Sequence, residues 1–172
     1  MGELAMALDP PKTAAAAFDS LYRETARDLY VYVASMVGDR STAEDVTMTA
    51  FERAYRRRSS FDARRGSPRA WLFGIARNAA LDELRRRKRS APLASDVEAA
   101  IAVEPDEPER RLAVRHALAD LDARERELVA LKFVAGLSNT EIAEILGTSP
   151  TNAGTRLHRV VLKLREACHV PA

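Results

Sequence analysis

The segment from Ser67 to Arg89, SPRAWLFGIARNAALDELRRRKR, constrains the fold more than any other part of the chain. It opens with serine and then proline, which favour the N-cap and the first turn of a helix. Trp71 and Phe73 begin an apolar helical face, and the segment ends in five consecutive basic residues. The sequence therefore predicts a packed helix whose cationic end favours nucleic acid as a partner, although such basic runs are often only solvated faces.

Helical patterns also fill most of the remaining sequence. Apolar residues recur at helical spacing from Phe18 to Met36, and Gly38 then ends this first helix. Ser41 and Glu44 predict the capping box of a second helix. The later start and stop signals are Asp122 with Glu125, Gly136, Ser138 with Glu141, Gly147, and Ser149 before Pro150. No segment alternates in the manner of a strand, so we expect an all-α protein.

Charge divides the chain into three parts. Residues 1–90 carry a net charge of +5, residues 91–109 carry −6 with no lysine or arginine, and residues 110–172 carry +3. The acidic part also contains three prolines, which favour an extended connector. We therefore expect a disordered N-terminus (1–14), a helical domain (15–90), an acidic flexible linker (91–108) and a second small helical domain (109–172).

Composition excludes several classes of protein. The chain has no run of about 18 apolar residues, so we expect no membrane insertion and a cytoplasmic location. Cys168 is the single cysteine, which excludes an internal disulfide. The three histidines lack the spacing of metal ligands, and we expect no metal or other cofactor. The sequence also contains no phosphate-binding loop and no nucleophile beside a base, so an enzyme acting on nucleic acid is weakly supported.

A helix-turn-helix is predicted between Ser138 and Glu166. This motif needs a small residue where its two helices cross and a glycine at the turn, and Ala143 and Gly147 provide both. The exposed face of the second helix would then carry Asn152, Thr155, Arg156 and Arg159. Asparagine suits adenine, and arginine suits guanine or phosphate, so this face favours duplex DNA over an ordinary helical hairpin.

The polar loop from Ser59 to Gly66 precedes the basic helix. Phe61, Arg64 and Arg65 lie in this loop, close in sequence to Trp71. Aromatic and cationic side chains on a loop can receive a splayed base, so single-stranded or distorted DNA is a predicted partner. The alternative is that Trp71 serves only the core.

Three segments, AEDVTMTAF (43–51), AWLFGIARNAALDELRRRKR (70–89) and LSNTEIAEILGTSPTNAGTRLHRVVLKLRE (137–166), occur in a distinctive order and spacing. They resemble, respectively, the core-polymerase-binding helix, the minus-ten segment and the helix-turn-helix of bacterial extracytoplasmic-function (ECF) sigma factors of the sigma-70 family. The resemblance implies a protein that binds core RNA polymerase, traps the single-stranded minus-ten element and reads the minus-thirty-five duplex of promoter DNA. It also allows an anti-sigma factor as a partner.

The resemblance assigns a role to three groups of residues. Contacts to core polymerase are expected from Asp45, Met48, Thr49, Phe51 and Arg53. Contacts to minus-ten DNA are expected from Phe61, Arg64, Arg65, Trp71, Arg77, Asn78 and Arg85. Contacts to minus-thirty-five DNA are expected from Asn152, Thr155, Arg156, His158 and Arg159. The chain departs from the family pattern at Met48 and Thr49, where glutamine and an acidic residue are usual, and at Ala153 and Gly154, where valine and a basic residue are usual.

Energetics distinguish this role from that of a stand-alone operator-binding regulator, which is the alternative. Opening DNA costs about 1.4 kcal/mol per base step, so a bubble of about ten steps costs about 14 kcal/mol. One stacked base returns only about 1–3 kcal/mol. A chain of 19.0 kDa that melts promoters therefore requires a larger partner.

Overall fold

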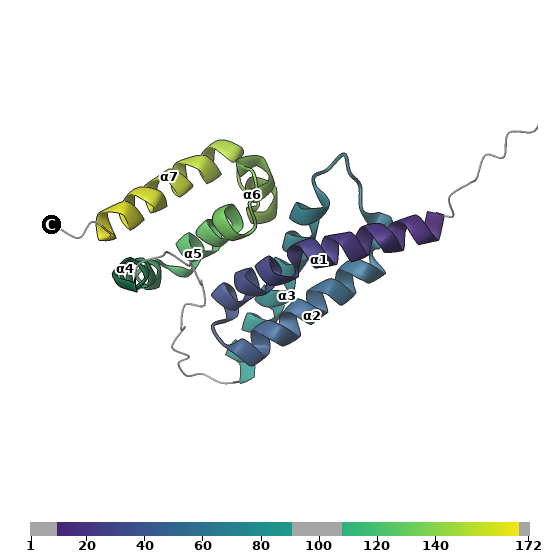
Figure 1. Cartoon of the computed structure of the whole chain (residues 1–172), viewed down its shortest axis with the longest axis horizontal. Coiled ribbons are helices and arrows are strands. Elements are labelled where there is room, and N and C mark those ends of the chain that lie inside the picture. Colours follow the sequence, from purple (N-terminus) through teal and green to yellow (C-terminus); the bar gives the residue numbers. More distant parts are fainter. Residues whose placement is uncertain (1–9, 91–107, 169–172) are drawn as a thin grey trace, which may run out of the picture.

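The computed structural model describes residues 10–90 and 108–168, which form helices and no strand (Figure 1). The N-terminal helix group comprises α1 (Pro10–Val37), α2 (Arg40–Arg56), the short 3-10 helix η1 (Arg58–Ser60) and α3 (Pro68–Ser90). The C-terminal helix group comprises α4 (Pro108–Ala119), α5 (Ala123–Val129), the π-helical turn η2 (Ala130–Val134), α6 (Asn139–Leu146) and α7 (Pro150–Ala167). The predicted all-α fold is therefore confirmed, while residues 91–107 of the expected linker lie outside the described residues.

The helices α1, α2 and α3 pack against one another around large buried side chains. Leu29, Tyr32 and Val33 recur on one face of α1 and are fully buried. Phe73 of α3 meets Tyr32 there, with ring centroids 5.3 Å apart. Burying each such side chain contributes about 1.5–3 kcal/mol relative to leaving it exposed, so this core stabilises the packing of α1 on α3.

The beginnings of α1 and α2 differ from the sequence-based expectation. The helix α1 begins at Pro10 rather than after residue 14. Proline suits the first turn of a helix, and the four alanines at 14–17 that follow favour its continuation. The capping box expected at Ser41 is wrong. Asp39 is the N-cap of α2, since it follows the left-handed Gly38 (φ 76°) in extended conformation and its carboxylate accepts a hydrogen bond from the Thr42 amide.

The predicted ends of the other helices are confirmed. The Ser67 side chain caps α3 by accepting from the Ala70 amide at 3.1 Å. Asp122 and Ser138 form complete capping boxes with Glu125 and Glu141 at the beginnings of α5 and α6. Gly147 ends α6 in the left-handed conformation (φ 65°), which glycine adopts without steric penalty. The helix-turn-helix therefore forms as the sequence predicts, with Ala143 buried.

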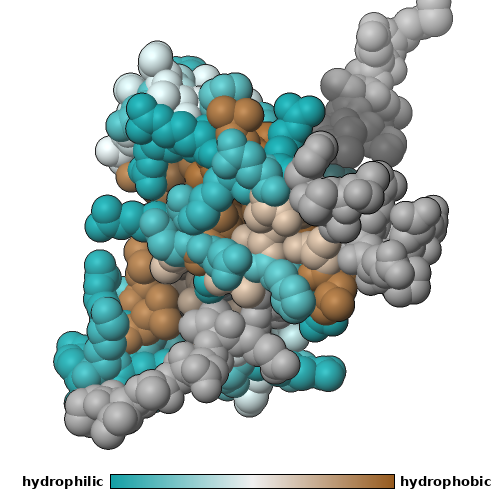
Figure 2. All heavy atoms as spheres, turned by 90° about the vertical axis from the view of Figure 1, so that its left-hand side faces the viewer, coloured by the Kyte–Doolittle hydropathy of each residue, from teal (hydrophilic) through white to brown (hydrophobic). Residues whose placement is uncertain are grey.

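The two helix groups share one core. Leu128, Leu131 and Ile142 of the C-terminal group belong to the buried cluster that contains Tyr32 and Phe73. Figure 1 shows α5 directed toward α1 and α3, while α4 and α7 lie farther out on the left. The outer helices have a small core of their own, formed by Leu118, Leu121, Val129 and Val160. Figure 2, which views this outer side, shows a largely hydrophilic face with apolar atoms between the polar ones.

Candidate nucleic-acid interface

A cavity of about 360 Å³ opens between the loop that follows η1 and the first half of α3. Its lining includes four of the predicted minus-ten residues: Phe61, Arg65, Trp71 and Asn78. The rings of Phe61 and Trp71 are tilted against each other, with centroids 5.5 Å apart. Trp71 is only half-buried, so one part of its ring supports the core and another part remains accessible. Aromatic, cationic and amide groups thus surround one cavity.

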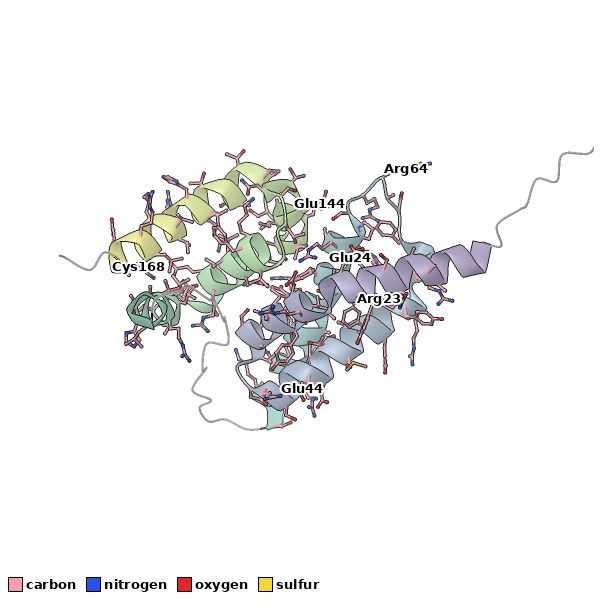
Figure 3. The ribbon with its side chains drawn as sticks, in the orientation of Figure 1. Arg23, Glu24, Glu44, Arg64, Glu144 and Cys168 are labelled. Atoms are coloured by element: carbon pink, nitrogen blue, oxygen red, sulfur yellow. The ribbon has the colours of Figure 1, made fainter. Side chains whose placement is uncertain are left out.

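The other three predicted minus-ten residues do not line this cavity. Arg64 lies at the exposed tip of the loop (Figure 3), and Arg85 is exposed in the last part of α3, 3.5 Å from Asp82. Arg77 is turned away from the cavity because its Nε donates a hydrogen bond of 2.7 Å to Glu127 of α5. The structure therefore brings together only the part of the predicted set that could hold a base.

The far wall of the cavity comes from α6, a contact that no sequence pattern indicates. Glu141, Glu144 and Ile145 line it. Ser67 donates its hydroxyl hydrogen bond to one carboxylate oxygen of Glu141, and Ser138 donates to the other, so the first turns of α3 and α6 meet at this carboxylate. Burial works to raise the pKa of Glu141, but the hydrogen bonds from Ser67 and Ser138 prevail and hold that pKa below its ordinary range.

Two further polar contacts join the helix groups. The Tyr32 hydroxyl donates to the same Glu127 oxygen that accepts from Arg77, at 3.3 Å. Burial is the main cause that raises the pKa of Tyr32 well above its usual value, and the negative charge of Glu127 adds to this effect. Arg69 pairs with Asp28 and also donates to the Ala135 carbonyl at 2.5 Å. No sequence pattern indicates these contacts, because they depend on how the two groups dock.

Residues predicted to contact polymerase lie along α2. Asp45 and Met48 are exposed, and Thr49 and Arg53 are partly exposed. Phe51 requires a correction, because only 5% of its surface is exposed. It packs beneath the helix against Phe18 and Tyr22, so it fixes the position of α2 and is not available to touch a partner. The apolar spacing that places Phe51 in the core is the same spacing that leaves Met48 outside.

The predicted minus-thirty-five residues lie on the free surface of α7. Asn152, Thr155, His158 and Arg159 are exposed, and Arg156 is partly exposed. Ser149 caps this helix by accepting from the Asn152 amide, with Pro150 at its first position. A side chain at Gly154 would begin 3.1 Å from the side-chain amide nitrogen of Asn139, at the beginning of α6.

Among the described residues, no helix is both long enough and apolar enough to cross a membrane.

Two protein-family models match the chain: Sigma-70 region 2 over residues 21–90, and Sigma-70, region 4 over residues 111–164. The chain is 32% identical over 157 residues to the ECF RNA polymerase sigma factor SigL of Mycobacterium tuberculosis, and 88% of each chain is covered. The sigma factor RpoE, solved with the anti-sigma factor NepR from Bartonella quintana, has a similar fold. Its TM-score is 0.71 at 23% identity, with 91% of this chain and 99% of that chain covered. CnrH, solved with the cytosolic domain of CnrY, also has a similar fold. Its TM-score is 0.64 at 26% identity, with 94% of this chain and 96% of that chain covered.

The chain therefore belongs to the sigma-70 family of RNA polymerase sigma factors. Within that family it is one of the ECF sigma factors. Its function is to bind core RNA polymerase and to direct transcription initiation at specific promoters.

Proposed function

We propose that this sigma factor divides its work among three surfaces. The exposed face of α2 binds core polymerase, the cavity beside Trp71 holds an unpaired minus-ten base, and α7 reads the minus-thirty-five duplex. The observation that carries the proposal is the convergence of Phe61, Arg65, Trp71 and Asn78 on one cavity. Such a combination of stacking and cationic groups binds single-stranded nucleic acid, because every base has a stacking face.

The polymerase surface is supported by the character of α2. Asp45, Met48, Glu52 and Tyr55 recur every three or four residues and are all exposed. They form a stripe that is both acidic and apolar, and Met48 exposes 55% of its surface. Contiguous exposed apolar surface marks protein interfaces, and the two apolar members of this stripe, Met48 and Tyr55, lie seven residues apart on the same face of the helix. Met48 would accordingly replace a polar contact of the family with an apolar one, which leaves the binding role of this helix intact.

The duplex surface is supported by the geometry of α7. Asn152, Thr155 and Arg159 lie on one face of the helix, at a spacing of three and four residues. The first turn also presents backbone amides that suit a phosphate. Gly154 has no side chain to contact a base. Base contacts to the minus-thirty-five duplex would therefore come from Asn152, Thr155 and Arg159, with Arg156 and His158 beside them.

Core polymerase is the partner that makes promoter opening energetically feasible, and we propose that the chain acts with it in the cytoplasm without a catalytic site of its own. We further propose that an anti-sigma factor regulates this chain. CnrH, which has a similar fold and 26% sequence identity, was solved bound to the cytosolic domain of CnrY.

Two substitutions test the division of surfaces. Arg159→Ala should weaken promoter selection and leave binding to core polymerase intact, because its side chain lies on α7. Asp45→Ala should weaken binding to core polymerase and leave promoter preference unchanged in the holoenzyme that still forms. Competition binding to core and run-off transcription measure the two effects, after circular dichroism has established that both variants fold. Equal loss of the same activity in both variants would contradict the assignment.

A further inference from the structure

A second cavity lies between α3, α5 and the turn that joins α6 to α7. Its volume is about 380 Å³, and it shares no lining residue with the cavity beside Trp71. Figure 1 shows the beginning of α7 beside α6, on the side of the C-terminal helix group that is nearer to α3. We call this space the arginine cavity. It is lined by Arg77, Arg124, Glu127, Leu146, Gly147, Thr148 and Arg156.

The arginine cavity carries an excess of positive charge. Its lining includes three guanidinium groups and one carboxylate, that of Glu127, so three positive charges and one negative charge give a net +2. The Glu127 carboxylate already accepts hydrogen bonds from Arg77 Nε at 2.7 Å and from the Tyr32 hydroxyl at 3.3 Å. Its negative charge is therefore engaged by Arg77, and the lining offers no second carboxylate to the other two arginines.

Arg124 and Arg156 line the cavity from two different helices. Arg124 lies in the first turn of α5 and is exposed, whereas Arg156 lies in the second turn of α7 and is partly buried. In the described part of the chain, neither guanidinium forms an ion pair. The carboxylates of Asp122 and Glu125 are engaged by the α5 cap and by Lys163. Like charges that converge without a counter-charge are unfavourable, so the arrangement favours an anion in the cavity.

Phosphate is the anion that this set of donors suits best. Each guanidinium presents five N–H donors in a planar fork that matches two phosphate oxygens, and the Thr148 hydroxyl adds a neutral donor. Among the described residues, Arg77 donates a hydrogen bond only through Nε, so its terminal nitrogens are available. A phosphate monoester carries about two negative charges and a carboxylate only one, so phosphate balances the lining. A volume of about 380 Å³ also falls within the about 300–1,000 Å³ that small-molecule sites span.

The position of the cavity favours a small ligand over DNA. Arg77 belongs to α3, whereas Arg124 and Arg156 belong to the C-terminal helix group, so the arginines converge from both groups. The groups contact each other directly beside the cavity, where Tyr32 and Arg77 reach Glu127. A DNA duplex cannot pass between helix groups that are in contact, whereas a small phosphorylated molecule fits the space.

We infer that the arginine cavity binds a small molecule through a phosphate or diphosphate group. Arg77, Arg124 and Arg156 hold the phosphate oxygens, and Thr148 donates to one of them. This inference assigns a function to Arg124 and gives Arg77 and Arg156 a ligand other than DNA in the free chain. The bound molecule contacts both helix groups and therefore stabilises the folded chain, as does any ligand that binds only the folded state. The inference does not depend on the three surfaces proposed above.

Isothermal titration calorimetry of the full chain with pyrophosphate and with inorganic phosphate tests the inference. Sodium chloride keeps the ionic strength constant, because salt screens nonspecific attraction between an anion and exposed arginines. Arg124→Gln removes one guanidinium from the lining, at an exposed position outside the proposed polymerase and DNA surfaces. Arg115→Gln is the matched control, because Arg115 is exposed on α4 and does not line the cavity. Circular dichroism establishes that both variants fold.

We expect the natural chain and Arg115→Gln to bind one pyrophosphate per chain in a saturable manner. Inorganic phosphate should compete for the same site. Arg124→Gln should bind pyrophosphate about tenfold more weakly, which is the usual effect of losing a hydrogen bond to a charged group. Pyrophosphate should also raise the unfolding temperature of the natural chain and of Arg115→Gln more than that of Arg124→Gln.

A short duplex of unrelated sequence tests the other source of phosphate, the DNA backbone. No saturable binding of pyrophosphate, or equal weakening by Arg124→Gln and Arg115→Gln, would overturn the inference. A chain that binds no pyrophosphate but loses duplex affinity in Arg124→Gln alone would overturn it as well, and would assign Arg124 to the DNA backbone.

Discussion

At the scale of single residues, Trp71 has a place in the core and a proposed role in recognition. Its half-buried ring packs on the core cluster and also lines, beside Phe61, the cavity that we propose holds a minus-ten base. A position of this kind limits what evolution or mutagenesis can change, because a smaller side chain loses packing and stacking together.

Trp71→Ala should lower the affinity of the holoenzyme for a single-stranded minus-ten oligonucleotide by about 5- to 150-fold, the equivalent of about 1–3 kcal/mol for one stacked base. Trp71→Phe keeps an aromatic ring and should retain most of that affinity. Fluorescence anisotropy measures both, and thermal unfolding reports the packing that is lost. If Trp71→Ala folds and binds the oligonucleotide normally, the ring serves only the core.

Glu141 predicts a pH dependence. Its pKa is held below the ordinary glutamate value of about 4.3, so it stabilises the folded chain above that pH and loses this contribution as pH falls through the depressed value. The free energy of unfolding of the natural chain should therefore exceed that of Glu141→Gln at pH 7, and the difference should shrink below about pH 4. Urea titrations of the two proteins at pH 7 and below about pH 4 measure this difference in the free energy of unfolding. A difference that is constant with pH would show that charge at Glu141 is not involved.

At the scale of helices, capping decides where each element begins. The Asp122 carboxylate accepts from the amides of Arg124 and Glu125, both at 2.8 Å, while Glu125 also pairs with Lys163 of α7 at 2.8 Å. The N-cap of α5 is thus connected to the recognition helix. Loss of the cap would disturb the platform on which α7 rests.

Asp122→Ala should destabilise the chain by about 1 kcal/mol, the usual cost of removing an N-cap side chain. Asp122→Asn retains an acceptor oxygen and should cost less. Chemical denaturation of the three proteins gives the comparison, and equal stability of Asp122→Ala and the natural chain would indicate that the cap contributes nothing.

Helix ends were predictable because capping is local. Ser138, Gly147 and Ser149 act on amides and carbonyls within four residues, so the sequence contains the whole signal. At the beginning of α2, both Asp39 and Ser41 could act as the N-cap. The turn at Gly38 places Asp39 directly before the helix, so Asp39 is the cap and Ser41 lies inside the helix. The exposed faces of α2 and α7 followed from helical periodicity in the same way.

At the scale of the whole molecule, docking of the helix groups was not predictable from sequence. The contacts of Ser67 with Glu141 and of Arg77 with Glu127 span 74 and 50 residues. The acidic connector in the sequence indicates two separable domains, but it does not indicate whether those domains contact each other. Arg77, expected on the DNA backbone, is paired in this structure with Glu127 of the other helix group.

The central claim is that this chain works as a subunit of RNA polymerase. Size-exclusion chromatography of the purified chain with bacterial core polymerase tests it most directly, with duplex DNA alone as the comparison. We predict co-elution with core polymerase and only weak, salt-sensitive binding to free DNA. No binding to core polymerase, together with tight binding to a palindromic duplex, would contradict the account and indicate a stand-alone regulator.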